Sequence, residues 1–401
     1  MTAPVAIIGG GIQGCSVAVE LSMRGISSHM FDRRAELMMA ASRWNEGKIH
    51  LGYLWAKDET HKTVGAALRH ALAFRRKLAE YLGRDALTAH TSTPFVYAVL
   101  RDSQVAADAF QAHVERVDRM VAEALTQPKA DYLGQRQVQR SMAAVGVCDD
   151  ATVAWTVQTP EIAVNPHVVA DALRERVTSD PSITVQCDIV MDRVRRREDG
   201  RFEVHQAALG WHGPFRAVVN CSWESRLWLD ETIGLRPTRP WLLRYKLALH
   251  AAEVSNAGSV PSATLVLGPY GDVVNLGGGR LYMSWYPVTR LSSSGSIRAD
   301  DPEEGLTDAE RERIAGAAFN ALVRHVPSLG DVRLNPKRIA VRGGFIVAWG
   351  ATDVSDPASG LHKRHEVGVH SQKSYHSVDT GKYSYAPLQA AEVARRIEAE
   401  L

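Results

Sequence analysis

Residues 5–14 read VAIIGGGIQG, an apolar run that leads directly into a cluster of glycines. The run Val5–Ile8 predicts a buried strand. Residues 12–24 predict a helix that ends at Gly25, and Ser28–Phe31 predicts a second strand after it. A strand, a helix and a strand in this order form the βαβ unit of a parallel sheet. The opening stretch therefore predicts an α/β protein with a Rossmann-like domain.

The glycines follow the spacing G-x-G-x-x-G, which is typical of a turn that binds a dinucleotide. Gly9 permits the tight turn, Gly11 lets the backbone approach a pyrophosphate, and Gly14 lets the helix pack on the strand. Asp32 follows about 20 residues later, where an acid holds a ribose hydroxyl and disfavours NADP. The spacing does not separate FAD from NAD, and a glycine-rich turn of another α/β protein is the alternative. We expect dinucleotide contacts from Gly9, Gly11, Ile12, Gln13, Gly14, Asp32 and Arg33.

Residues 41–53 read ASRWNEGKIHLGY, and this stretch resembles the second flavin-contacting segment of the D-amino-acid-oxidase-like FAD-dependent oxidoreductases. That superfamily includes glycine oxidase, sarcosine oxidase, L-2-hydroxyglutarate oxidase and glycerol-3-phosphate dehydrogenase. The core N-x-G-x-I-H-x-G is most similar to the hydroxyglutarate oxidase branch. The resemblance implies FAD as the cofactor, with contacts from Ser42, Asn45 and Gly47.

Two later stretches extend the resemblance. Residues 218–223 read VVNCSW and stand where the family has an Ala-Thr-Gly-like strand end, although Ser222 replaces the usual glycine. Residues 379–387 read DTGKYSYAP and resemble the family's last motif, whose loop and helix N-terminus face the flavin pyrimidine. N–H groups and a positive helix end would stabilise negative charge on the reduced ring there. The residues that the resemblance adds to the cofactor site are Asn220, Gly381, Lys382 and Tyr383, with the backbone of Ile189 and Val190 on the adenine side.

The resemblance covers nearly the whole chain and implies a Rossmann-like FAD-binding domain with a discontinuous antiparallel-sheet substrate domain. Amphipathic periodicity predicts long helices at Lys62–Leu82 and Ser103–Leu125. From Trp241 the pattern changes to short alternating runs, which predict antiparallel strands with a turn at residues 277–279. We expect Ile339–Ala348 to return to the FAD-binding domain. The expected FAD-binding domain is 1–90, 146–235 and 336–401, and the expected substrate domain is 91–145 and 236–335.

His50 is the leading candidate for a catalytic residue. It lies in the stretch that the resemblance places along the flavin, and histidine is the usual general base near neutral pH. Two alternatives are a covalent link to FAD and a structural histidine that bonds to backbone. We favour FAD held without a covalent bond.

Other side chains are candidates for the substrate pocket. Lys48 and Lys382 are candidates to hold a carboxylate or stabilise reduced flavin, with a solvated surface lysine as the alternative. Arg342 and Arg364 lie where relatives place a carboxylate-binding arginine, a task that suits the guanidinium fork. His362 and His365 lack further ligands for a metal, so we expect an exposed loop there and no metal site. The aromatic candidates for the pocket wall, with core packing as the alternative, are Tyr53, Trp55, Trp285, Tyr286 and Trp349.

The amino-acid composition limits the classes of binding partner that we expect. The formal net charge is +2, from 47 basic and 45 acidic residues, so nothing favours nucleic acid or an anionic membrane. The four cysteines form no C-x-x-C pair, which suits a reducing cytoplasm. No run of apolar residues is long enough for a membrane span, and we expect no signal peptide. A small-molecule substrate and O2 or another electron acceptor are the expected partners.

These observations favour oxidation of a C–N or C–OH bond of a small metabolite by hydride transfer to FAD. An amine or amino acid is preferred, because an amine that binds neutral needs no protein base and the sequence has no clearer base than His50. The alternatives are an FAD-dependent monooxygenase, which shares the glycine motif, and a non-catalytic flavoprotein.

Overall fold

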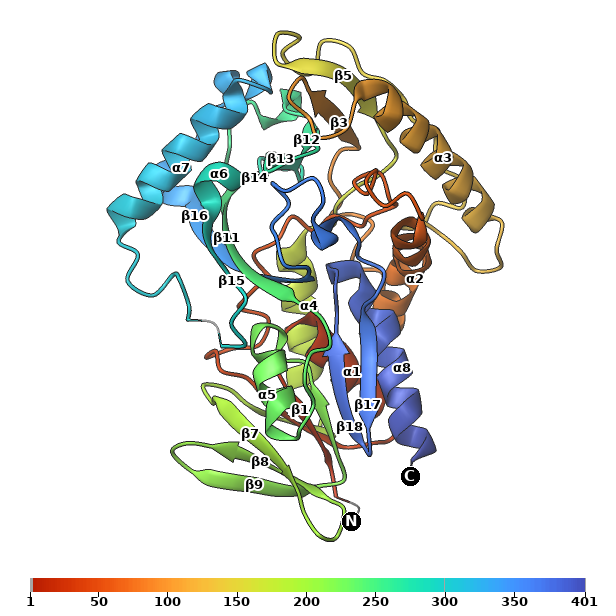
Figure 1. Ribbon diagram of the computed structural model, residues 1–401, viewed down its shortest axis with the longest axis vertical. Coiled ribbons are helices and arrows are strands. Elements are labelled where there is room, and N and C mark those ends of the chain that lie inside the picture. Colours follow the sequence, from red (N-terminus) through yellow and green to blue (C-terminus); the bar gives the residue numbers. More distant parts are fainter. Residues whose placement is uncertain (1–2, 299, 401) are drawn as a thin grey trace.

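The computed structural model describes residues 3–298 and 300–400. A six-stranded sheet forms the lower part of the molecule in Figure 1, where both ends of the chain lie. Its strands lie in the order β17, β18, β10, β1, β2, β6, and every neighbouring pair is parallel except β17 and β18. The bounds are β1 Val5–Ile8, β2 Ser28–Phe31, β6 Ile183–Gln186, β10 Ala217–Asn220, β17 Gly368–Gln372 and β18 Tyr375–Asp379. This parallel sheet confirms the predicted Rossmann-like fold.

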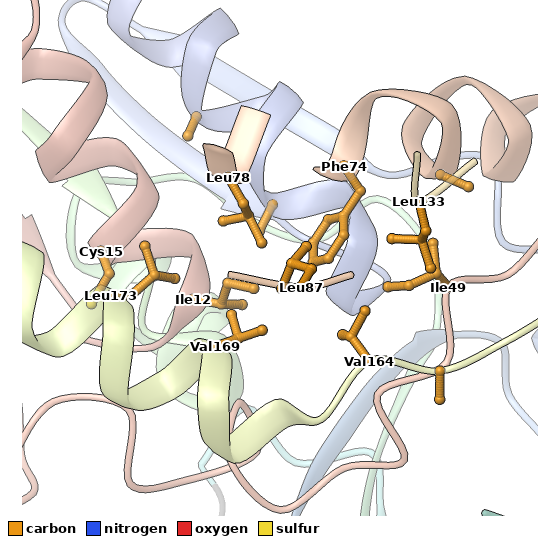
Figure 2. Close-up of a cluster of buried hydrophobic side chains, with 14 of the residues drawn as sticks. Ile12, Cys15, Ile49, Phe74, Leu78, Leu87, Leu133, Val164, Val169 and Leu173 are labelled. Atoms are coloured by element: carbon orange, nitrogen blue, oxygen red, sulfur yellow. The ribbon is translucent and has the colours of Figure 1, made fainter. Parts of the chain in front are cut away.

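Helices cover one face of this sheet. α1 packs against α4 and α8, and α2 packs beside them. Figure 2 shows apolar side chains from three of these helices meeting in one cluster, with Ile12 from α1, Phe74 from α2 and Val169 from α4. Asn165 caps α4, because its side chain accepts the His167 N–H at 3.0 Å. The bounds are α1 Ile12–Ser22, α2 Lys62–Leu82, α4 Pro166–Thr178 and α8 Ala386–Ala399.

A small three-stranded sheet covers the other face. Apolar side chains of this sheet, among them Phe202 and Phe215, pack on Ala6 and Ile8 of β1. β1 is therefore buried on both sides, as the continuous apolar run at its position predicts. The bounds are β7 Met191–Arg196, β8 Phe202–Gln206 and β9 Gly210–Phe215, followed by α5 Arg226–Thr232.

A nine-stranded sheet forms the upper part of the molecule in Figure 1. Its path runs β15, β11, β14, β13, β12, β3, β5, β4, with β16 paired to β11, and only the β3–β12 pair is parallel. The predicted turn between β13 and β14 is confirmed, because Gly277, Gly278 and Gly279 all have positive φ. The bounds are β3 Phe95–Leu100, β4 Met142–Ala143, β5 Val153–Gln158, β11 Trp241–Ala251, β12 Ser262–Val266, β13 Gly271–Asn275, β14 Leu281–Trp285, β15 Arg290–Ser294 and β16 Ile339–Trp349, with helices α3 Ala107–Leu125, α6 Tyr286–Thr289 and α7 Asp308–Val323.

The prediction that Ile339–Ala348 returns to the FAD-binding domain is wrong. β16 pairs with β11 along its whole length, from Ile339 opposite Ala251 to Trp349 opposite Trp241. β5 likewise pairs with β3 in the large sheet, although the predicted division puts it with the dinucleotide domain. Strand partners far apart in the sequence leave no local pattern, so only the folded sheet reveals them. The remaining limits of the two domains stay a prediction.

The helices of the described parts of the chain include none with the length and apolar content of a transmembrane segment.

Candidate active site

One continuous cavity connects the two large sheets. It begins at the carboxyl ends of β1 and β2, where Gly9 and Asp32 line it. It passes the segment 40–50 and ends against the face of the nine-stranded sheet that carries Arg244 and Lys246. The carboxyl ends of parallel strands are where doubly wound sheets bind their ligands. This cavity is therefore the candidate active site.

The turn after β1 has no room for side chains at its glycines. Gly9 has φ +104°, and a Cβ there would lie 2.4 Å from the Cys221 carbonyl oxygen. A Cβ on Gly14 would lie 1.8 Å from the Gly9 carbonyl oxygen, so the helix could not pack as it does. A Cβ on Gly11 would lie 2.9 Å from the Ser42 Oγ. The tight turn predicted for Gly9 and the close packing predicted for Gly14 are confirmed, and Gly11 leaves bare backbone facing the cavity.

Asp32 lies at the same end of the cavity. Its carboxylate accepts the Gly10 N–H at 2.5 Å and the Arg34 N–H at 2.7 Å. Burial raises the pKa of Asp32 and outweighs these two N–H bonds, which would lower it. The predicted cofactor residues that line this end are Gly9, Gly11, Ile12, Gln13, Asp32, Arg33, Ile189 and Val190.

Ser42 and Asn45 line the middle of the cavity. Asn45 also holds its own loop, because Nδ2 donates to the Ala41 and Ser42 carbonyls, both at 3.0 Å, and Oδ1 accepts the Gly47 N–H at 2.8 Å. Gly47 has φ +68°, and a Cβ there would lie 1.9 Å from the Val164 carbonyl oxygen. Gly47 is outside the cavity wall, so its predicted cofactor contact is corrected to a role in shaping this loop.

His50 lies in the cavity wall between two carboxylates. Its Nε2 is 3.5 Å from Glu46 Oε1, and its Nδ1 is 3.4 Å from Glu161 Oε1. The ring centroid is 5.0 Å from that of Trp55, which also lines the cavity. Glu161 is fully buried and accepts the Leu51 N–H at 2.6 Å, which fixes its position behind His50. The three side chains form a row of acid–base groups that starts at the cavity.

Both carboxylates beside His50 are held in their charged form. Burial alone would raise the pKa of Glu46, but the hydrogen bond to His50 and the charges of Lys48 and Lys246 keep that pKa well below its ordinary value. Burial would also raise the pKa of Glu161, but the neighbouring His50, 3.4 Å away, and the charge of Lys48 outweigh burial and lower it. Each carboxylate can therefore accept a hydrogen bond from the imidazole, which in its neutral form donates to one of the two and keeps its other nitrogen available for a proton.

Lys48 has partners of its own at the wall of the cavity. Its side chain is 1% exposed, and Nζ donates to Asp272 Oδ1 at 3.0 Å and to the Thr264 hydroxyl. Burial would lower the pKa of Lys48, but the charges of Asp272 and Glu46 outweigh burial and raise it. Lys48 is thus part of a buried ion pair, and the alternative of a solvated surface lysine is wrong.

Four further cations line the large-sheet end of the cavity: Arg244, Lys246, Arg364 and Lys382. Burial and the charge of Arg244 lower the pKa of Arg364 to about 10. Burial and the charge of Arg364 lower the pKa of Lys382 to about 8. These cations act on each other's pKa values and line the same end of the cavity. Their combined positive charge favours a negatively charged ligand there.

Of the two predicted carboxylate-binding arginines, only Arg364 reaches the cavity. Arg342 has a side chain that is 52% exposed, pairs with Glu303 at 3.2 Å and is outside the cavity wall, so its predicted role is wrong. The alternation of β16 turns this position to solvent. The loop around His362 is not the exposed loop predicted, because Arg364 is buried and both side chains line the cavity.

Several other predicted residues lie behind the wall. The Tyr53 hydroxyl donates to Asp118 at 2.7 Å, and Trp285 stacks on His325 with centroids 5.3 Å apart. The Asn220 amide is buried and donates to the Tyr375 hydroxyl at 2.9 Å. These contacts favour the alternative of core packing for Tyr53 and Trp285, and a cofactor contact of Asn220 stays a prediction. The predicted residues outside the wall are Gly14, Gly47, Tyr53, Asn220, Trp285, Arg342 and Trp349, and those within it at this end are Lys48, His50, Trp55, Tyr286, Arg364, Gly381, Lys382 and Tyr383.

The sequence interpretation missed Arg244, Lys246, Glu46 and Glu161. Residues 241–250 read WLLRYKLALH, in which two cations alternate on an otherwise apolar strand. Alternation places both on one face of the sheet, and cations on a buried face are a signal for a ligand. Glu161 left no such signal, because its partner His50 is far away in the sequence.

Comparison with known proteins places these features in context. The sequence profile of the family described as "DAO: FAD dependent oxidoreductase" matches residues 4–357. No curated protein sequence matches the chain.

Solved structures with the same fold cover nearly all of the chain. Glycine oxidase from Geobacillus kaustophilus matches with a TM-score of 0.66 at 14% identity, covering 98% of this chain and 95% of that chain. Dithionite-reduced L-alpha-glycerophosphate oxidase from Mycoplasma pneumoniae, with FAD bound, gives 0.68 at 13% identity, covering 99% and 95%. Iminodiacetate oxidase from Chelativorans sp. BNC1 gives 0.64 at 16% identity, covering 98% and 95%.

Proposed function

This chain belongs to the FAD dependent oxidoreductase (DAO) family, and from that premise we propose that it oxidises a C–N or C–OH bond of a small anionic metabolite, with an amine or amino acid preferred. The cofactor is FAD. The observation that carries the proposal is the single cavity that joins the glycine turn after β1 to a set of buried cations on the large sheet. A dinucleotide and a charged substrate would meet in such a cavity.

The residues at the glycine turn fit the cofactor. Gly11 has no side chain that would cover its backbone, and a pyrophosphate can approach closely only where the backbone is bare. We assign Asp32 to the ribose and the backbone of Ile189 and Val190 to the adenine side. We assign Ser42, Asn45, Gly381, Lys382 and Tyr383 to the flavin half, because these residues line the middle and the far part of the cavity.

Bound FAD supplies the hydride acceptor, and the protein must hold the substrate and take one proton from its N–H or O–H group. We assign that proton to the His50–Glu46 pair, since both side chains line the cavity and lie 3.5 Å apart. Glu161 positions the imidazole from behind. Arg364 holds an acid group of the substrate, and Lys382 faces the negative charge that develops on reduction.

We also propose that FAD is held without a covalent bond. A covalent bond from either ring nitrogen of His50 to the flavin would take that nitrogen away from the carboxylate that it faces. Acid precipitation should leave the yellow colour in the supernatant. Colour that stays in the pellet and is lost in His50→Ala would identify His50 as an attachment point.

The test of the proposed function is anaerobic mixing of the holoenzyme with amino acids, N-methylated amines and 2-hydroxy acids. Loss of the flavin absorbance band with one of these compounds supports it, and O2 or another acceptor should restore the band. Reduction by NAD(P)H alone would indicate a monooxygenase instead. A flavin that none of these compounds reduces would indicate a non-catalytic flavoprotein.

We place the protein in the cytoplasm, because Cys15, Cys148, Cys187 and Cys221 are all free thiols, as a reducing compartment would keep them. Extraction of the native protein from a cytosolic fraction would test this.

A further inference from the structure

Five cations line the substrate end of the cavity, and only two have carboxylate partners. Lys48 pairs with Asp272 at 3.0 Å, and Arg244 pairs with Asp353 at 3.0 Å. Within residues 3–298 and 300–400, no carboxylate lies within 4.0 Å of the charged ends of the other three cations, Lys246, Arg364 and Lys382. A buried cation without a direct partner is unfavourable, so a bound anionic ligand would stabilise all three charges.

Lys246 and Arg364 are both more than nine-tenths buried. Lys246 Nζ donates to the Ser284 hydroxyl at 3.0 Å and lies 4.6 Å from the centre of the Tyr286 ring. Arg364 donates to the Val347 carbonyl at 3.3 Å. Their hydrogen-bond partners are neutral, so neither cation forms a direct ion pair among the described residues, and Glu46 and Asp272 act on Lys246 only from beyond 4.0 Å.

The two cations mark separate binding points. Burial and the charge of Arg244 lower the pKa of Arg364, and the Arg244 guanidinium and Lys246 Nζ lie 5.9 Å and 4.6 Å from the centre of the Tyr286 ring. Lys246 follows Arg244 by two residues on the same face of β11, which places their backbones about 7 Å apart along the strand. One point is therefore the Arg244–Arg364 pair, and the second is Lys246.

We propose that the substrate carries two anionic groups, one bound by Arg364 with Arg244 and the other bound by Lys246. This inference rests on the proposed function, which assigns Lys382 to the reduced flavin and leaves two cations without a direct carboxylate partner for the substrate. It narrows the substrate class to amino acids, amines or hydroxy acids that carry a second carboxylate or a phosphate.

The test measures binding rather than turnover. Oxidised holoenzyme is titrated with unreactive acids that differ by one carboxylate, propionate against succinate, and the change in the flavin spectrum gives the dissociation constant. Succinate should bind about 10- to 100-fold more tightly, the usual effect of one additional charged hydrogen bond. Phosphoglycolate against malonate then distinguishes phosphate from carboxylate as the second group. Equal affinities for propionate and succinate would overturn the inference.

Two variants assign the groups to residues. Lys246→Gln should remove the preference for the diacid, and Arg364→Gln should weaken the binding of both acids. Arg342→Gln is the matched control, because Arg342 is exposed, pairs with Glu303 and lies outside the cavity. FAD content and thermal midpoint identify a variant that misfolds. If Lys246→Gln weakens the binding of both acids equally, the two cations bind the same anionic group and the inference is wrong.

The two proposals fail in different ways. Diacid-selective binding by an enzyme that no amine, amino acid or hydroxy acid reduces would contradict the proposed function and leave the binding inference standing. If monoacids reduce the flavin as fast as diacids and bind with equal affinity, the proposed function stands and the binding inference is wrong.

Discussion

The two ends of the cavity are built by different means. At the glycine turn the wall is mostly backbone, supplied by a short segment around Gly9 and Gly11 and closed by Ser42. At the large sheet the wall is made of charged side chains, which come from strands and loops far apart in the sequence. Backbone recognition suits a group that every relative binds, whereas side-chain recognition can change with the substrate. The cofactor end should therefore respond to steric change, and the substrate end to changes of charge.

The largest effect is expected at the glycine turn. Gly11→Leu should abolish FAD retention. Even a Cβ at this position would lie 2.9 Å from Ser42 Oγ, and a larger side chain would fill the space beside the bare backbone where the pyrophosphate binds. The flavin-to-protein ratio measures this. Gly65→Leu is the control, since Gly65 is exposed in α2 and a Cβ there would meet no atom within 4 Å. Normal FAD content in Gly11→Leu would break the contrast between the two ends.

His50 should affect chemistry more than cofactor binding. His50→Ala should slow flavin reduction by the true substrate about 10²–10⁴-fold, the usual effect of general base catalysis, with FAD content near normal. Stopped-flow reduction per bound flavin measures it. An unchanged rate would refute the catalytic role and favour oxidation of a neutral amine without a protein base.

Glu161 should have a smaller effect, because it acts through His50. Glu161→Gln keeps the shape but removes the charge 3.4 Å from Nδ1, and we expect about a 10-fold slower reduction together with a shifted pH profile. Glu123→Gln, at an exposed position of α3, serves as the control. A slower rate with the parent pH profile would mean that Glu161 has only a structural role.

The smallest effect is expected from the titration of Lys382. Burial and Arg364 lower its pKa to about 8, so the side chain loses its charge as the pH rises through that value. Flavin reduction should then slow several-fold. Lys382→Arg should keep the rate at high pH, and Lys382→Met should be slow and flat throughout. If the reduction rate of the parent enzyme does not decline as the pH rises, Lys382 does not stabilise the negative charge on the reduced flavin.

The dinucleotide end of the cavity could be predicted from local sequence patterns. The βαβ unit, the roles of Gly9 and Gly14 and the bounds of α2 all follow from spacing between near neighbours, and they agree with the structure. The physical reason is that turns, helix periodicity and buried strands depend on the conformational preferences of residues close together in the chain. Lys48 and Lys382 were also candidates on the basis of adjacent motifs.

The substrate end of the cavity depends on contacts between residues far apart in the chain, which local sequence patterns do not reveal. The choice between Arg342 and Arg364 depends on which face of β16 meets solvent, and that follows from its pairing with β11. The position of Glu161 behind His50 joins residues far apart in the sequence. Lys246 became a candidate only when its buried surroundings proved to contain no carboxylate partner among the described residues. Burial, register and the pairing of charges are properties of the packed molecule, and no local pattern encodes them.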